Sequence, residues 1–388
     1  MRVLILGGTG IIGRELAAVA DLDGHRVTVV SRGRRSESQA QRGSVETIVG
    51  DAYDSVALAE RLSGRTFDAV VDLLSFTPEQ VRASVSLIAR QCDQYVLVSS
   101  ATIFDGASAE APIVEGSKRV DGPWTYPAQK IATEEALHQA CVRLGHAYTI
   151  VRPYITYSAQ RVAFGAWESG AVLSRLADER VVVIGEKLAR TPTSLTHSRD
   201  LARGILALLI NPQAHNEDFN IASEEQVTWM DVQQIAATAI GARTRLVKVP
   251  DARLVEIFPE LMGKISDRLL PRIFDNSKLR SACPGFEFEY SVRAGYEQCV
   301  PEVLAHPAAG IGYAEQGKMD RLATHACDGD ARVRKELRSY GLNLARHSPL
   351  EYLRYASGRY PALAWAKRTL TSWAREVSPD PYGVSAGR

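Results

Sequence analysis

The chain of 388 residues is longer than one ordinary domain, so we expect about two units around a large core. It is 45% hydrophobic and 23% charged, with a formal net charge of +1, which argues against a protein dominated by nucleic-acid binding. Five widely spaced cysteines indicate neither a disulfide framework nor a metal site. No apolar run reaches the roughly 18 residues of a membrane span, and the N-terminus is not that of a signal peptide. We therefore expect a cytoplasmic protein with reduced thiols.

The first thirteen residues predict a strand, a glycine loop and a helix in immediate succession. Residues 1–6 form a short apolar run, Gly7-Gly8-Thr9-Gly10-Ile11-Ile12-Gly13 follows it, and residues 15–20 have the composition of a helix. This order places bare backbone N–H groups and a helix N-terminus where the pyrophosphate of a dinucleotide can bind. The residues expected to hold that cofactor are Gly7, Gly10, Ile11, Ile12 and Gly13.

The segment after the second predicted strand bears on which dinucleotide binds. His25–Ser31 is that strand, and Arg32, Arg34 and Arg35 follow it with no carboxylate among them. An acidic residue here would bind the ribose hydroxyls of NAD, whereas an arginine accommodates the 2′-phosphate of NADP. The sequence therefore favours NADP(H) over NAD(H) through Arg32; a solvated basic loop is the alternative.

Alternating strands and helices continue to about residue 151 and predict a doubly wound parallel sheet of the Rossmann type. Asp51, after the third strand, can approach the adenine or cap the helix that begins near Ser55. Leu73, at the end of the fourth strand, is a further expected cofactor contact. The predicted strands are 1–6, 25–31, 45–49, 67–73, 94–98 and 148–151, with a helix at 78–90.

Polar residues that follow the fifth strand are the candidate catalytic group. Ser99, Ser100 and Thr102 lie where the carboxyl end of a parallel strand meets the ligand crevice. Tyr126 and Lys130 are four residues apart in a segment that runs into a helix predicted at 131–144, so they share one helix face. A lysine cation within about 4–6 Å lowers the pKa of a tyrosine, which moves the phenol toward use as a general base.

The glycine loop, the serine pair and Tyr-x-x-x-Lys, in this order, resemble the extended short-chain dehydrogenase/reductases, and within them the NAD-dependent epimerase/dehydratase group. The resemblance extends from residue 1 to about 300 and includes Arg152-Pro153 and the segment Thr196–Ala202. It implies that Ser100 orients the substrate, that Tyr126 is the general acid/base, and that Lys130 tunes Tyr126 and holds the nicotinamide ribose. His197, within the resembling segment, is expected to be structural.

The resemblance also implies a domain organisation. Residues 1–153 would form the dinucleotide-binding domain, to which residues 196–222 return. Residues 154–195 and 223–300 would form a smaller substrate lobe. Residues 301–388 lie outside the family pattern and predict a helical extension, with a linker at 306–310 and helices at 332–339, 349–356 and 361–377. We expect this basic extension to pack on the same or a neighbouring subunit, with an acidic partner as the alternative.

The chain departs from the nucleotide-sugar epimerase pattern at several substrate positions. Thr193 stands where a pyrophosphate-binding arginine is common, and the expected substitutes are Arg190, Arg268 and Arg272. Thr102 and Tyr154 are the other expected substrate contacts. Phe104 replaces a usual tyrosine and removes one hydroxyl. Ala101-Thr102 replaces the acidic pair of sugar dehydratases, so 4,6-dehydration is not expected.

The resemblance predicts an NAD(P)-dependent epimerase that acts on a nucleotide-activated sugar or related polyol through a transient keto intermediate. An NADPH-dependent carbonyl reductase is the alternative enzyme. Arg32-Gly33 and the segment Thr196–Ala202 also resemble the chloroplast stem-loop-binding proteins. The alternative that is not an enzyme is therefore a dinucleotide-binding RNA-associated or regulatory protein. Those proteins usually lack the tyrosine that this chain has at Tyr126. We expect a homodimer with a small-molecule substrate, no metal, no membrane contact and no nucleic-acid partner.

Overall fold

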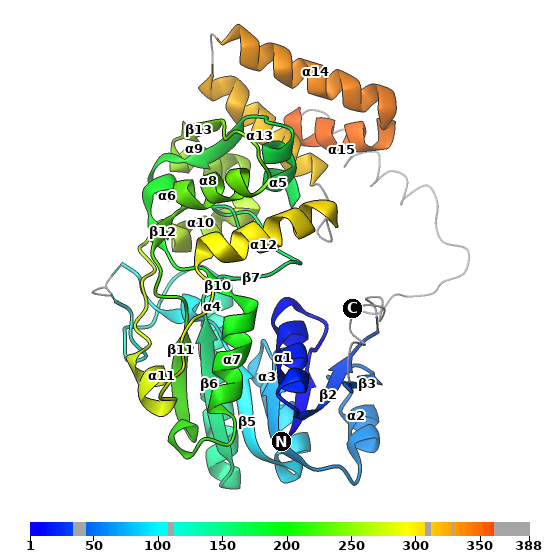
Figure 1. Ribbon diagram of the computed structural model, residues 1–388, viewed down its shortest axis with the longest axis vertical. Coiled ribbons are helices and arrows are strands. Elements are labelled where there is room, and N and C mark those ends of the chain that lie inside the picture. The colour runs from blue at the N-terminus through cyan, green and yellow to red at the C-terminus, as the bar shows by residue number, and fades with distance from the viewer. Residues whose placement is uncertain (34–43, 108–111, 169, 307–311, 328–329, 361–388) are drawn as a thin grey trace.

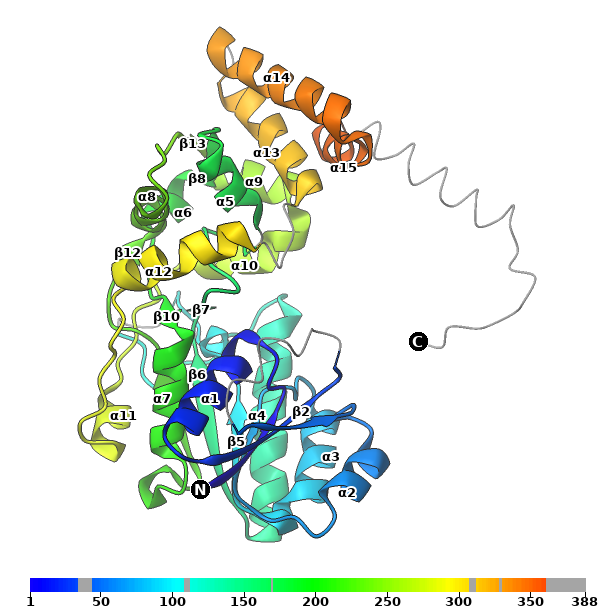
Figure 2. The same cartoon turned by 45° about the vertical axis from the view of Figure 1, so that its right-hand side comes forward.

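The chain folds into two stacked lobes with a helical extension beyond the second (Figure 1). The computed structural model describes residues 1–33, 44–107, 112–168, 170–306, 312–327 and 330–360. The N-terminal lobe contains the main sheet. The second lobe lies over one end of that sheet, and the extension lies at the far end of the second lobe (Figures 1 and 2).

The first lobe is built on a seven-stranded parallel sheet in the order β11-β6-β5-β4-β1-β2-β3. Its strands are β1 (Arg2–Leu6), β2 (Arg26–Ser31), β3 (Glu46–Val49), β4 (Phe67–Asp72), β5 (Cys92–Val98), β6 (Ala147–Pro153) and β11 (Glu217–Ile221). The chain moves outward from β1 to β3 and then returns to build the other half from β4. The order thus reverses between β1 and β4, and a ligand crevice forms at the carboxyl ends of the strands at such a point. The predicted doubly wound sheet is confirmed.

Alternate residues of the strands are buried on opposite faces of the sheet. Val3 and Ile5 of β1 share a core with one helix layer, whereas Leu4 and Leu6 share a core with the other. Since every position of a central parallel strand is covered, the strand is a continuous apolar run. The first layer is α1 (Ile11–Leu22), α7 (Ser198–Leu208) and α11 (Ser277–Ala282); the second is α2 (Ser55–Leu62), α3 (Pro78–Ile88) and α4 (Thr125–Leu144).

Helix α4 begins earlier than predicted. The sequence places its start near residue 131, but the helix begins at Thr125, so Tyr126 is in its first turn. Pro127 is tolerated there because N–H groups of a first turn have no intrahelical partner. Tyr126 therefore sits at the N-terminal end of α4, with Lys130 one turn further on.

The second lobe has its own apolar core, which includes the fully buried Trp167, Trp229 and Tyr296. Its two-stranded parallel sheet pairs β8 (Val182–Gly185) with β13 (Leu246–Val249). Its helices are α5 (Gly170–Ala177), α6 (Glu186–Arg190), α8 (Trp229–Ala239), α9 (Asp251–Ile257), α10 (Met262–Arg268) and α12 (Val292–Ala305). Short pairs connect the lobes: β7 (Thr156–Tyr157) with β10 (Thr196–His197), and β9 (Pro192–Thr193) with β12 (Val227–Thr228). The expected lobe boundary at residue 300 falls inside α12.

The extension packs on the second lobe of its own subunit. Its helices are α13 (Tyr313–Ala326), α14 (Ala331–His347) and α15 (Pro349–Arg359). The sequence predicts the last two in part but not α13, whose Met319 and Leu322 belong to the core of the second lobe. Most of the predicted linker and the predicted helix at 361–377 lie outside the described residues. In the described part of the chain, no helix is long and apolar enough to span a membrane.

Candidate active site

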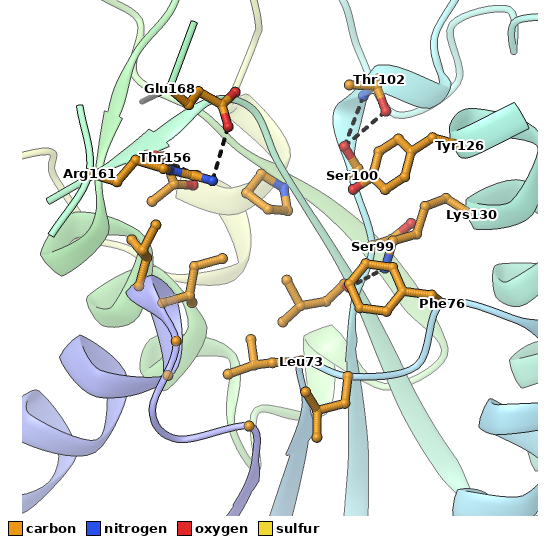
Figure 3. Close-up of a pocket in the computed structure, with 18 of the residues that line it drawn as sticks. Leu73, Phe76, Ser99, Ser100, Thr102, Tyr126, Lys130, Thr156, Arg161 and Glu168 are labelled. Carbon is orange, nitrogen blue, oxygen red and sulfur yellow. Dashed lines mark hydrogen bonds and ion pairs between the residues drawn. The ribbon is translucent and has the colours of Figure 1, made fainter. Parts of the chain in front are cut away.

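A cavity of about 1030 Å³ lies between the carboxyl ends of the sheet strands and the second lobe. The sequence-predicted site residues that line it are Gly7, Gly10, Ile11, Ile12, Gly13, Arg32, Asp51, Leu73, Ser99, Ser100, Thr102, Tyr126, Lys130, Tyr154 and Arg268. Figure 3 shows the catalytic candidates on one side and residues of the second lobe on the other. The cavity thus joins the predicted cofactor and substrate sites in one space.

The glycine loop closes one end of this cavity. Gly7 has φ +99°, a conformation that favours glycine, and a Cβ added at Gly13 would overlap the carbonyl oxygen of Gly7. Helix α1 starts after Gly10 with no side-chain cap. Its first N–H groups are therefore available for an anion, as a pyrophosphate requires.

Arg32 and Asp51 lie at the part of the cavity formed by the ends of β2 and β3. Asp51 does not cap α2, because Asp54 accepts the hydrogen bond from the Ala57 N–H instead. The Asp51 carboxylate accepts from the Tyr53 backbone N–H at 3.0 Å. Tyr53 also lines the cavity, and burial raises the pKa of its phenol to about 12. Arg34 and Arg35 lie outside the described residues.

Ser100 and Tyr126 lie side by side on one wall of the cavity (Figure 3). The Ser100 oxygen accepts from the Thr102 backbone N–H at 3.3 Å and lies 3.0 Å from the Thr102 hydroxyl. Strand β5 ends at Val98, and Ser100 is the N-cap of the single 3₁₀ turn Ala101–Ile103. A substrate oxygen placed here can meet a serine and a tyrosine hydroxyl together.

Lys130 is held against the floor of the cavity. Its ammonium donates to the carbonyl oxygens of Ser75 at 3.2 Å and Val98 at 3.3 Å, and it lies 4.1 Å from the centre of the Phe76 ring. Burial lowers its pKa to about 8, although the nearby Asp72 and Glu134 favour the charged form. Two of its three N–H bonds are thus used within the protein, and one remains for a ligand.

The environment of Tyr126 differs in one respect from the sequence argument. Burial raises the pKa of Tyr126, and the hydrogen bond from Ser100 is the leading influence that lowers it. Lys130 is not among the leading influences that the described residues exert. Its ammonium points into two carbonyl groups, so its charge acts less on the phenol than the spacing alone suggests.

A buried ion pair fixes the helix that carries Tyr126 and Lys130. Arg152 on β6 makes two hydrogen bonds of 2.9 Å to the Glu134 carboxylate on α4, and it also pairs with Asp218 on β11. Arg152 and Glu134 are almost fully buried. Arg152 of the Arg-Pro pair is therefore a positioning residue, and it does not line the cavity.

Residues of the second lobe that the sequence did not single out complete the cavity. Glu168 pairs with Arg161 at 3.1 Å, Lys264 at 3.2 Å and Arg268 at 2.5 Å. Burial alone would raise the pKa of Glu168, but these cations outweigh it and hold the value at about 2. Trp124, just before α4, also lines the cavity. Arg161 and Glu168 lie between β7 and α5, and Lys264 and Arg268 lie on α10. They carry no local motif, so only the fold brings the two segments together.

Two of the predicted substrate arginines do not line the cavity. Arg190 is exposed at the end of α6. Arg272 is buried, where it donates to the Phe104 carbonyl oxygen at 2.8 Å and pairs with Asp267. Arg272 is thus engaged by protein groups, and Arg268 alone of the three faces the cavity.

Two other predicted positions have clear surroundings. Tyr154 lines the cavity and donates to Asp267 at 2.8 Å. His197 is buried, stacks on Tyr290 with ring centres 4.0 Å apart, and accepts from the Arg199 N–H at 3.2 Å. His197 lies outside the cavity, in agreement with the expected structural role.

Among the described residues, no group of three or more His, Cys, Asp or Glu side chains could hold a metal.

The side chains and backbone of the cavity fit a nicotinamide dinucleotide. The Ser99 hydroxyl lines the cavity and is buried without a hydrogen-bond partner among the described residues, which is costly unless a ligand provides one. The uncapped α1 N-terminus supplies donors for phosphate, and Lys130 supplies a donor for a ribose hydroxyl.

The chain belongs to the NAD dependent epimerase/dehydratase family, whose model matches residues 3–222. Its fold and this match make it an extended short-chain dehydrogenase/reductase, a class of NAD-dependent epimerases and reductases.

The relatives of this chain are named for different activities. Chloroplast stem-loop binding protein of 41 kDa b from Arabidopsis thaliana is 26% identical over 62% of this chain, which spans 63% of that relative's length. The 2'-dehydrokanamycin reductase of Streptomyces kanamyceticus is 27% identical over 74% of this chain and 80% of its own length. The solved UDP-glucose 4-epimerase of Thermotoga maritima, with UDP-glucose, has a TM-score of 0.64 at 17% identity, covering 78% of this chain and 98% of that one. At that identity the likeness supports the fold alone.

Proposed function

We propose that this chain is an NAD(P)-dependent epimerase that inverts a hydroxyl-bearing carbon of a nucleotide-activated sugar or related polyol through a transient keto intermediate. The observation that carries the proposal is the convergence of Ser100, Tyr126 and Lys130 on one cavity that also contains the glycine loop. The family is consistent with this chemistry, and the choice of substrate is our own inference.

The dinucleotide would be held by backbone and side-chain groups at the sheet end of the cavity. The first turn of α1 would bind the pyrophosphate, Arg32 would bind a 2′-phosphate, and Asp51 would face the adenine. Leu73, Ser99 and Lys130 would contact the nicotinamide half. When bound, the nicotinamide would supply hydride transfer from and to the substrate carbon.

Tyr126 would exchange the proton at the reacting oxygen. In the oxidative half, its phenolate oxygen takes the hydroxyl proton of the substrate; in the reductive half, the phenol returns a proton to the carbonyl oxygen. Ser100 donates to Tyr126 or to the substrate oxygen, so it aligns the two. Trp124 and the second lobe would exclude water from the reacting centre.

An NADPH-dependent carbonyl reductase is the second candidate. Burial raises the pKa of Tyr126, which keeps the phenol protonated at neutral pH and suits it to donate a proton during reduction. Two relatives are also named as reductases, 2'-dehydrokanamycin reductase and ceramide reductase. This reaction uses the same residues as the second half of the epimerisation.

Mass spectrometry of small molecules released from the denatured, purified protein distinguishes the two candidates. An epimerase returns the hydride within one turnover, so we expect a retained oxidised dinucleotide. A reductase exchanges its cofactor at each turnover, so an empty site that binds added NADPH would favour the second candidate. Failure to bind NAD or NADP in either redox state would contradict both.

We also propose that the protein is a cytoplasmic homodimer. The five cysteines are free thiols, as a reducing compartment would keep them. Light scattering coupled to size-exclusion chromatography tests the dimer, since a monomeric mass at micromolar concentration would contradict it.

A further inference from the structure

The helical extension exposes cations and leucines together on two consecutive helices. Helix α14 lies at the outer end of the molecule in both views of the fold (Figures 1 and 2). Its exposed residues at spacings of three and four lie on one side of the helix. The α14–α15 face, as we call it, consists of the exposed residues Lys335, Arg338, Leu342, Arg346, Leu350, Leu353 and Arg354.

The face continues from α14 to α15 across the turn that joins them. Helix α14 ends at His347 and α15 begins at Pro349. Both of these residues are exposed, as are Arg346 before them and Leu350 after them. The exposed surface is therefore not interrupted where one helix gives way to the other.

The face is basic, and the acids of the same helices do not balance it. Among the described residues, no ion-pair partner is found for any of its four cations. Glu336 on α14 pairs with Arg245 of the second lobe, and Glu351 on α15 is partly buried, where its charge acts on the Tyr313 phenol. Both carboxylates thus serve contacts within the protein, and the face retains its positive charge.

The leucines of the face are unusually exposed for their type. Leu342, Leu350 and Leu353 are 61%, 66% and 61% exposed. Apolar side chains that gather on a surface and are surrounded by polar ones mark an interaction site. The partner must therefore offer an apolar layer as well as negative charge.

These two requirements decide among the possible occupants. A second copy of the same face would bring like charges together. Residues 361–388 of this chain contain four Lys/Arg against two Asp/Glu, so they are also basic. A nucleic acid would match the cations but would leave the leucines beside phosphates and water. An anionic lipid surface matches both, because cations bind its headgroups while leucines enter the boundary of the acyl layer.

We propose that the α14–α15 face binds the surface of a membrane that contains anionic lipids. Since no helix in the described part of the chain could span a bilayer, the contact is with the surface. None of the seven residues lines the cavity, so this proposal goes beyond the proposed function and does not depend on it. It revises the sequence-based expectation of no membrane contact.

Flotation of the full chain with lipid vesicles tests the proposal. One set of vesicles is phosphatidylcholine alone, and the other is phosphatidylcholine mixed equally with phosphatidylglycerol. Each cation at an anionic surface strengthens binding about fivefold, so we expect the mixed vesicles to bind at least about tenfold more tightly. Added salt should reduce this preference because it screens the charges.

Two double variants separate the contributions of charge and apolar surface. Lys335→Gln with Arg338→Gln removes two cations, and Leu342→Gln with Leu353→Gln removes two apolar side chains. Each should weaken binding to the mixed vesicles about tenfold or more. Glutamine favours a helix and all four positions are exposed, so the thermal unfolding temperature should stay that of the wild type.

Matched controls change the same residue types elsewhere on the surface. Arg190→Gln removes an exposed arginine at the end of α6, and Leu22→Gln removes a leucine that is 72% exposed at the end of α1. Both should bind the mixed vesicles as the wild type does.

Three results would overturn the proposal. The first is equal binding to the two sets of vesicles, absent binding included. The second is a preference for the mixed vesicles that persists in both double variants. The third is binding of polyuridylate that weakens in the cation variant and not in the leucine variant, without binding to vesicles, which would assign the face to nucleic acid.

Discussion

Trp124 packs its indole directly against Gly263, so that a Cβ added at Gly263 would overlap the indole ring. Trp124 precedes α4 of the first lobe, and Gly263 is in α10 of the second lobe. This contact closes the cavity between the lobes beside Tyr126, whose ring centre lies 5.5 Å from that of Trp124.

Gly263→Val should therefore displace Trp124 and loosen the closed cavity. We expect substrate KM to rise about tenfold, with a smaller change in kcat, because binding surface is lost while Ser100 and Tyr126 stay in place. Steady-state kinetics and thermal unfolding measure both. Gly116→Ala is the control, since a Cβ there meets nothing within 4 Å. Unchanged KM in Gly263→Val would show that the Trp124 contact does not shape the site.

The extension depends on one buried carboxylate. Asp320 on α13 is fully buried and pairs with Arg175 at 2.6 Å and Arg180 at 2.9 Å, while the Tyr355 hydroxyl donates to it at 2.6 Å. Asp320→Asn would leave two buried guanidinium groups without their charge partner, which costs about 3–5 kcal/mol.

Urea unfolding of Asp320→Asn measures that loss. Asp121→Asn, at an exposed position, should change the free energy of unfolding by no more than about 0.5 kcal/mol. If the two variants were equally stable, the extension would not be an integral part of the second lobe.

The buried Lys130 should give stability a specific pH dependence. Its pKa falls from the ordinary 10.5 to about 8 in the folded protein. Between these values the unfolded chain holds more protons, so the free energy of unfolding rises with pH. The charge of Lys130 thus costs stability below pH 8, and that cost is removed as pH rises toward 10.5.

The measurement is the difference between wild type and Lys130→Met, because buried cysteines and tyrosines also titrate in this range. The wild type should gain stability relative to the variant between about pH 8 and 10, on the order of 3 kcal/mol if the shift is complete. A difference that does not vary with pH would mean that Lys130 is not desolvated as the structure indicates.

Arg32 should decide the choice of dinucleotide. Arg32 lines the cavity just beyond β2, and a guanidinium can form bidentate, charge-assisted bonds to a 2′-phosphate. Titration should show tighter binding of NADP than of NAD, and Arg32→Asp should reverse that order. Arg26→Asp, at the opposite end of β2, should keep it. A clear preference of the wild type for NAD would refute the role of Arg32.

The sheet and the cofactor end of the cavity could be predicted from sequence because their determinants are local. Gly7, Gly13, Ser100, Tyr126 and Lys130 each belong to a short segment in which one strand or helix end fixes the geometry. The cavity brings all of them together, although their catalytic roles remain proposals.

The second-lobe side of the cavity and α13 could not be predicted in the same way. Arg161 and Glu168 lie between β7 and α5, whereas Lys264 lies on α10, so the pairing of Glu168 with Lys264 depends on long-range packing. The same holds for Asp320, whose partners are about 140 residues earlier in the chain. Sequence spacing also does not report where the Lys130 ammonium points. It donates to the carbonyl oxygens of Ser75 and Val98, which explains why Lys130 influences Tyr126 less than predicted.

The most direct test of the account is the turnover of Tyr126→Phe on a substrate of the wild type, measured beside its dinucleotide affinity. The variant keeps the ring against Trp124 and leaves Gly7, Gly10, Gly13 and Lys130 intact, so fold and cofactor binding should persist. It loses the hydroxyl that exchanges the proton, so the rate should fall by about 10²–10⁴. Full turnover by Tyr126→Phe would contradict the account, because the proton exchange is assigned to the hydroxyl that this variant lacks.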